Sequence, residues 1–145
     1  MSKIGKNKFL IFFVKGKSMW PLLKDGDFVL CKKTKDIKIF DIVAVKNKNK
    51  TIIHRFFLMR KNKLLLHGDN NASFLKANAA FESYEIEKLV GKVVGFIRKN
   101  KTYYGFLFFI LSTISLIYSL IKIIPFLIKK FLLNIKMIFK NIFFL

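Results

Sequence analysis

The chain has 145 residues, of which 28 are Lys or Arg and eight are Asp or Glu, so its formal net charge at pH 7 is +20. This length accommodates one compact domain and an appendage, and it excludes two full domains. Because Cys31 is the only cysteine, an intrachain disulfide is also excluded, and we expect a buried free thiol.

The basic charge narrows the classes of partner. Arrays of Lys and Arg bind nucleic acid by releasing counterions from phosphates. Here the lysines are spread through every segment and are not gathered on one helix. A basic surface also binds anionic lipid headgroups, with each nearby Lys or Arg contributing about 1 kcal/mol. The pattern therefore favours a lipid membrane over nucleic acid as the partner.

Short β-rich runs separated by polar turns fill the chain from residue 9 to 97. The expected strands are Phe9–Val14, Phe28–Cys31, Ile42–Val45, Thr51–Met59, Leu64–His67 and Leu89–Ile97. The Lys- and Asn-rich connectors 46–50 and 60–63 suit hairpin loops. We predict a small, mostly antiparallel β domain over residues 1–102, in which residues 77–87 form either a helical turn or a loop.

Two helical segments are expected after this domain. Residues 103–121 carry no charged side chain. A helix of this length is long enough to cross a hydrocarbon layer of about 30 Å. This predicts a single transmembrane helix. In residues 122–145 four of the five lysines, Lys122, Lys129, Lys136 and Lys140, share a narrow helical arc. This predicts a basic amphipathic helix lying at the membrane interface, after a bend at Pro125. Basic residues flank both ends of the span, so the side of the membrane that holds the active site stays open.

A candidate nucleophile, Ser18, lies between Gly16 and Pro21 and ahead of a Gly26-Asp27 turn. Gly16 leaves room for a substrate backbone, and Pro21 fixes the backbone downstream. A serine hydroxyl cleaves an amide only with a base within about 3 Å and donors for the oxyanion. The alternative is an exposed loop serine with no catalytic role.

His54 is the candidate general base, because histidine titrates near neutral pH and this one lies in a predicted strand, 36 residues after Ser18. His67 is the other imidazole and a rival for the role. Fifteen residues after His54, Asp69 follows Gly68 in a segment that suits a turn after a strand.

Taken in order, the segments Ser18-Met19-x-Pro21, Ile53-His54-Arg55 and Gly68-Asp69 resemble the signal peptidase I family, in its Ser-His branch typical of the endoplasmic reticulum, archaea and some Gram-positive bacteria. The resemblance covers residues 9 to 97. It implies a membrane-bound serine endopeptidase that cleaves signal or leader peptides of precursor proteins after small residues, without a metal or cofactor. Ser18 and His54 would be catalytic, and the substrate would bind as an extended strand beside Gly16, Met19 and Pro21.

Two departures from the family pattern affect what the resemblance implies. The acid that orients the histidine is expected six residues after Asp69, where this chain has Leu75. Either Asp69 takes this role, as a third catalytic residue, or the site works as a Ser-His dyad. Phe40 also precedes Asp41 where the family commonly has glycine, which affects a turn.

Leu75 keeps a second class of function open, namely a catalytically weak or inactive relative that binds peptides at a membrane. The self-cleaving SOS repressors share this β fold as well. They pair serine with lysine and carry a DNA-binding helical domain, and neither feature is expected here.

Overall fold

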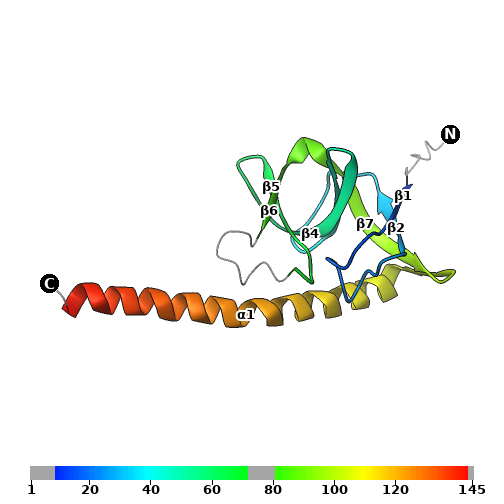
Figure 1. Cartoon of the computed structure of the whole chain (residues 1–145). Coiled ribbons are helices and arrows are strands. Elements are labelled where there is room, and N and C mark those ends of the chain that lie inside the picture. Colours follow the sequence, from blue (N-terminus) through cyan, green and yellow to red (C-terminus); the bar gives the residue numbers. More distant parts are fainter. Residues whose placement is uncertain (1–8, 72–80, 144–145) are drawn as a thin grey trace.

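The computed structural model describes residues 9–71 and 81–143, which form a curled antiparallel sheet followed by one long helix (Figure 1). The strands pair in the order β1-β2-β7-β3-β4-β5-β6, and β8 adds to β7. Their bounds are β1 (Phe9–Phe13), β2 (Phe28–Lys32), β3 (Ile42–Asn47), β4 (Lys50–Arg60), β5 (Lys63–His67), β6 (Glu82–Glu85), β7 (Leu89–Arg98) and β8 (Lys101–Tyr104).

All six predicted runs are strands, which confirms the mainly β class. The polar connectors are tight hairpin turns, as expected: Lys61 and Asn62 both adopt positive φ between β4 and β5. The turn between β7 and β8 repeats this geometry at Lys99 and Asn100. Two consecutive residues with positive φ match the right-handed twist of the flanking strands, so these Lys-Asn pairs set the register of each hairpin.

Two strands were not predicted. In the segment left open as a helical turn or loop, β6 pairs with β5 and is followed by a short 3-10 turn, Ile86–Lys88. The second is β8, which includes Tyr103 and Tyr104. These tyrosines were expected to begin the helix, but pairing with β7 satisfies their backbone groups, and Tyr103 stacks on Phe96 at 4.7 Å.

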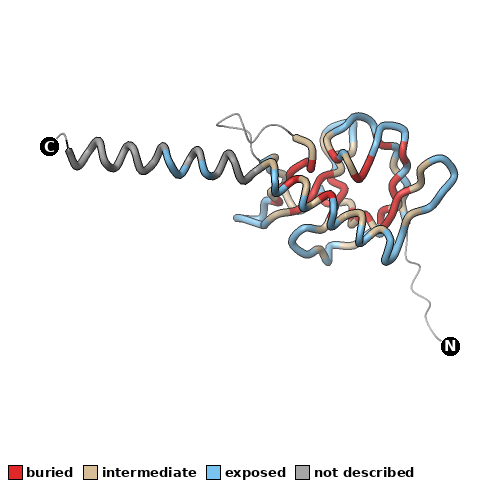
Figure 2. The backbone as a smooth tube through the Cα atoms, turned by 90° about the horizontal axis from the view of Figure 1, so that it is seen from below, coloured by how far each residue is buried: buried red, intermediate tan, exposed pale blue. Residues whose placement is uncertain are grey.

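Two apolar clusters of buried residues stabilise the domain. The buried stretches of the backbone are coloured red in Figure 2. Neighbouring residues of β3 belong to different clusters, since Ile42 lies in the first and Val43 in the second. This central strand is therefore buried on both faces. Cys31 is buried as expected, and burial raises the pKa of its thiol to about 11, so the thiol stays protonated.

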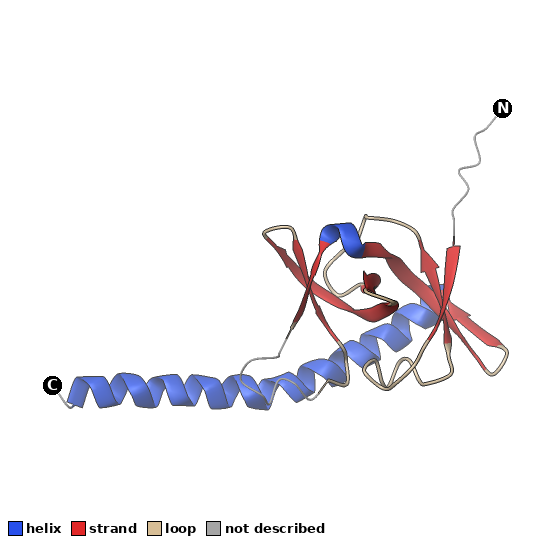
Figure 3. Ribbon diagram, turned by 45° about the horizontal axis from the view of Figure 1, so that its top comes forward, coloured by secondary structure: helices blue, strands red, loops and turns tan. Residues whose placement is uncertain are grey.

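A single helix, α1 (Gly105–Phe143), replaces the two helices that were expected. It continues through Pro125, so the boundary predicted there is not a break in the secondary structure. A proline inside a helix removes one backbone hydrogen bond and can be tolerated as a kink, and Leu and Lys on both sides favour the helix. The first half of α1 runs along the domain and the second half extends beyond it (Figure 3).

The first half of α1 has two different faces. Ser115 and Ser119 are buried against the domain, whereas Phe106, Phe109 and Ile121 are exposed. Its window Gly105–Lys122, with a mean hydropathy of 1.8, is long and apolar enough to cross a membrane by length and composition alone. The domain is thus followed by an apolar helix that also packs against it.

Candidate active site

Apolar side chains anchor the loop that carries Ser18 in the core of the domain. Met19, Leu22 and Leu23 are buried in the first apolar cluster, which leaves Ser18 half-buried at the surface of the loop. At the start of the loop Gly16 has φ +98°, a conformation that favours glycine, and its N–H donates to Asp25 Oδ1 at 2.6 Å. The backbone around Ser18 is therefore held before any substrate arrives.

Asp27, in the Gly-Asp turn after the loop, has a structural role. Arg98 on β7 donates to both of its carboxylate oxygens, at 2.9 and 2.6 Å. The same guanidinium donates to the Leu22 carbonyl at 2.7 Å, and the Lys24 N–H donates to Asp27 at 2.7 Å. A bidentate arginine–carboxylate pair is geometrically specific, so this contact anchors the end of the nucleophile loop on β7.

His54 is buried on β4, and it lines the same cavity of about 80 Å³ as Ser18. Gly68 lies between the two residues. A Cβ at position 68 would lie 2.7 Å from the Ser18 carbonyl oxygen and 3.0 Å from His54 Nε2. Any larger residue would therefore push the nucleophile loop away from the imidazole, which explains why a glycine is needed at this position. The same contacts place Nε2 on the side of Ser18.

Glu82 on β6 approaches the other nitrogen of this imidazole. Its Oε2 lies 3.4 Å from His54 Nδ1, and Tyr84 donates a hydrogen bond to the same oxygen at 2.6 Å. The contact with His54 is the main reason that the pKa of Glu82 falls to about 2, so this carboxylate is ionised at neutral pH. The imidazole thus lies between the loop that carries Ser18 and a carboxylate, which is the order of groups in a catalytic triad.

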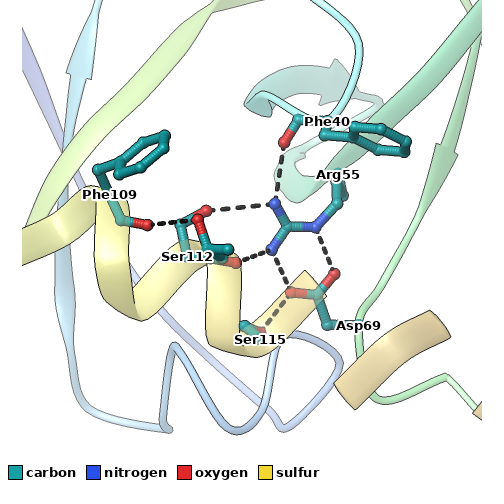
Figure 4. Close-up of polar contacts among 7 residues, drawn as sticks. Phe40, Arg55, Asp69, Phe109, Ser112 and Ser115 are labelled. Carbon is teal, nitrogen blue, oxygen red and sulfur yellow. Dashed lines mark hydrogen bonds and ion pairs between the residues drawn. The ribbon is translucent and has the colours of Figure 1, made fainter. Parts of the chain in front are cut away.

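Asp69 is placed elsewhere, in a buried ion pair with Arg55 (Figure 4). Arg55 Nε and Nη2 donate to its two oxygens at 2.8 and 2.6 Å, and Ser115 of α1 also donates to it. Arg55 in turn donates to Phe40 O at 2.9 Å and to Ser112 of α1. Because Arg55 and His54 are neighbours on a strand, their side chains point to opposite faces. The expectation that Asp69 orients His54 is therefore not matched by its contacts.

The other predicted site residues have mixed positions. Gly16 and Met19 both line the cavity with Ser18, although the Met19 side chain is only 3% exposed because most of it packs into the core. Pro21 is half-buried and follows a cis peptide bond. Leu75, the departure noted in the sequence, lies outside the described residues.

Glu82 was missed because its position depends on a pairing between distant strands. It belongs to the segment that the sequence left open, and it comes close to His54 only because β6 pairs with β5, with Glu82 opposite Leu66. The sequence offered one signal: the chain has only eight acidic residues, so few carboxylates can serve the histidine.

His67, the rival base, is enclosed by aromatic rings. It is buried and makes edge contacts with Phe57 and Phe81, with ring centroids 6.0 and 5.9 Å apart. Burial, with a smaller contribution from nearby His54, lowers the pKa of His67 from its ordinary 6.5 to about 4. This imidazole is neutral at physiological pH and packs as part of an aromatic group.

The pKa of His67 predicts an acid-sensitive stability. Between pH 6.5 and 4 the unfolded chain binds a proton at this position that the folded chain does not. The stabilisation is thus present above pH 6.5 and is lost as the pH falls to 4, by roughly 3 kcal/mol. In His67→Gln the free energy of unfolding, measured by urea denaturation across this range, should fall less than in the wild type. Parallel pH curves for the two proteins would contradict this assignment.

A curled β domain in which a serine and a histidine line one cavity has the architecture of a peptidase-type domain. The model of the Peptidase S24-like family matches residues 2–94, and the chain belongs to this family. It is also similar to the LexA repressor of Psychromonas ingrahamii, with 31% identity over 86 residues. The matched region is 59% of this chain and 40% of that repressor, so the chain spans less than half of the relative.

Proposed function

We propose that the chain is a membrane-associated serine endopeptidase of the signal-peptidase type, which cleaves signal or leader peptides from precursor proteins. One observation carries the proposal: Ser18 and His54 line one cavity, and Glu82 lies on the far side of the imidazole. The family membership supports a peptidase-type fold. The substrate class rests on the resemblance of the three sequence segments to signal peptidases.

The chemistry follows from the positions of the two imidazole nitrogens. His54 Nε2 accepts the hydroxyl proton as Ser18 Oγ attacks the scissile carbonyl, and the resulting imidazolium is stabilised by the Glu82 carboxylate at Nδ1. The same proton then passes to the leaving amine, and an acyl-enzyme remains on Ser18. A water molecule, deprotonated by His54, hydrolyses this ester and frees the serine. Glu82 is the orienting acid in this mechanism.

The dimensions of the cavity support cleavage after small residues. It is about 80 Å³ in volume, and apolar side chains, including Val14, Leu23 and Ile53, line it together with Ser18. A cavity of this size accepts a side chain such as that of alanine and excludes large ones. Next to it, β1 is an edge strand of the sheet, which suits the addition of an extended substrate strand.

We propose that α1 lies along the membrane surface and does not cross it, which revises the expected span over 103–121. Contacts with the domain run from Phe108, against Phe96, to Lys122, against Asn70. At 1.5 Å per residue this is about 21 Å of helix. If this segment crossed a hydrocarbon layer of about 30 Å, the charged domain would enter the layer with it. The exposed apolar face of α1 instead suits an interfacial helix.

Cleavage of a precursor peptide tests the proposed function. The full chain, bound to anionic vesicles, should cleave a fluorogenic peptide that carries the small-residue pattern A-x-A before the scissile bond. Ser18→Ala should lose this activity, whereas Ser83→Ala, a matched change at an exposed serine of β6, should keep it. Wild-type turnover in Ser18→Ala would refute the nucleophile. Peptide binding without cleavage by the wild type would support the inactive peptide-binding module.

Self-cleavage is a second candidate, favoured by the similarity to a LexA repressor. Mass spectrometry of the purified chain, incubated without peptide, separates the two. Fragments that form in the wild type but not in Ser18→Ala, together with an uncut fluorogenic peptide, would replace precursor processing by self-processing.

A further inference from the structure

We propose that Tyr118 and Lys122 of α1 are positioning residues for the nucleophile loop, which they hold through Trp20 and Asn70. These four residues are called the helix clamp below. The proposal rests on the proposed function, because it concerns how Ser18 is held for catalysis. It assigns to α1 a part in the active site, in addition to any part in membrane binding.

Asn70 connects α1 to the backbone that carries Ser18. Its backbone N–H donates to the Ser18 carbonyl at 2.7 Å, and its side-chain Nδ2 donates to the Lys17 carbonyl at 3.1 Å. Asn70 thus contacts two adjacent carbonyls of the nucleophile loop, of which the Lys17 carbonyl also accepts from the Trp20 N–H at 3.1 Å. The orientation of the Asn70 amide therefore affects the position of the loop directly.

Lys122 fixes the orientation of that amide. Its Nζ donates to Asn70 Oδ1 at 2.7 Å. An ammonium group has only donors, so it pairs with the oxygen of an amide and never with its nitrogen. With Oδ1 held by Lys122, Nδ2 must face Lys17. If the ammonium were removed, the Tyr118 hydroxyl, 3.5 Å from Oδ1, would still face the amide. Because a hydroxyl can donate or accept, it would not prevent the amide from rotating, and the hydrogen bond to the loop would no longer be enforced.

Aromatic contacts complete the clamp beside the nucleophile. Trp20, two residues after Ser18, meets the Tyr118 ring edge to face, with centroids 5.2 Å apart. The Lys122 ammonium lies over the same tyrosine ring, 4.5 Å from its centroid. Such contacts contribute about 0.5 to 1.5 kcal/mol each. Both ends of the Ser18 backbone segment are therefore tied to one turn of α1.

This arrangement explains why the polar residues of an otherwise apolar helix are where they are. Tyr118 and Lys122 are four residues apart, so they lie on the same face of α1. Ser115, which donates to Asp69, lies on this face three residues earlier. This face of α1 therefore contacts two consecutive residues of the turn after β5, Asp69 and Asn70. Docking of α1 and the geometry of the nucleophile loop are thereby coupled.

The test uses Lys122→Met in the full chain on anionic vesicles, with Lys122→Arg as the conservative variant and Lys101→Met, at an exposed lysine of β8, as the charge-matched control. Trp20 is the only tryptophan of the chain, so its fluorescence reports on the clamp without any substrate. In Lys122→Met we expect acrylamide quenching of Trp20 to increase by about twofold, as the aromatic contact loosens. For the fluorogenic A-x-A peptide, we expect kcat to fall by about tenfold while KM changes little, because misplaced catalytic groups affect the chemical step.

Lys122→Arg should restore most of both signals, and Lys101→Met should match the wild type. Unchanged quenching in Lys122→Met would overturn the clamp, as would a rise in KM at constant kcat or an equal loss of kcat in Lys101→Met. If the wild-type chain cleaves no peptide, the proposed function fails, and the quenching of Trp20 in the same variants still decides whether α1 holds the loop.

Discussion

Replacing His54 with alanine is expected to lower kcat for a precursor peptide by at least about 10³-fold, and replacing Ser18 as well should lower it little further. The reason is that the two side chains perform one step: without the imidazole at Gly68, no base accepts the Ser18 proton. Rates for Ser18→Ala, His54→Ala and the double variant, measured on the same vesicles, check this non-additivity.

A graded series sharpens the test of the base. Glu82→Gln keeps the size of the side chain but removes the charge beside His54 Nδ1, so its loss of kcat should fall between the wild type and His54→Ala. Losses from Ser18→Ala and His54→Ala that add up in the double variant would show that the two residues act independently. The histidine would then have to be assigned another role.

The sequence predicted most of the fold because the domain is built from local signals. Apolar runs between Lys-Asn pairs define hairpins, and the turns at Lys61-Asn62 and Lys99-Asn100 have the positive φ values that such pairs tolerate. Ser18 and His54 were found because the residues around them carry a recognisable pattern. Both line the cavity in the structure.

What the sequence did not predict depends on contacts between distant segments. The approach of Glu82 to His54 follows from the pairing of β6 with β5, and the docking of α1 follows from single hydrogen bonds such as Lys122 to Asn70. A helix that is mostly apolar is interpreted first as a membrane span. The few polar residues on one face, among them Ser115, are buried, so this face is covered by protein.

Loss of the charge of Asp69 should mainly lower the stability of the chain, whereas loss of the charge of Glu82 should mainly lower its turnover. Asp69→Asn leaves the buried Arg55 guanidinium without its counter-ion, and we expect it to destabilise the chain by about 3 to 5 kcal/mol. Glu82 has a side chain that is 41% exposed, so Glu82→Gln should change the free energy of unfolding little while lowering kcat. Urea denaturation and peptide turnover, measured on both variants, give the four values needed.

Variants of the two carboxylates, together with one double variant, decide which carboxylate orients His54. Arg55→Met with Asp69→Leu removes both charges of the buried pair, and this double variant should recover much of the stability that Asp69→Asn loses, because no uncompensated charge remains. Its kcat should fall by no more than the loss expected for a loosened α1, about tenfold, because the contacts of Ser112 and Ser115 are lost while the His54 and Glu82 contact is untouched. A stable Asp69→Asn protein with no turnover, beside a fully active Glu82→Gln protein, would restore Asp69 as the orienting acid. The mechanism would then have to run through the turn after β5 and not through β6.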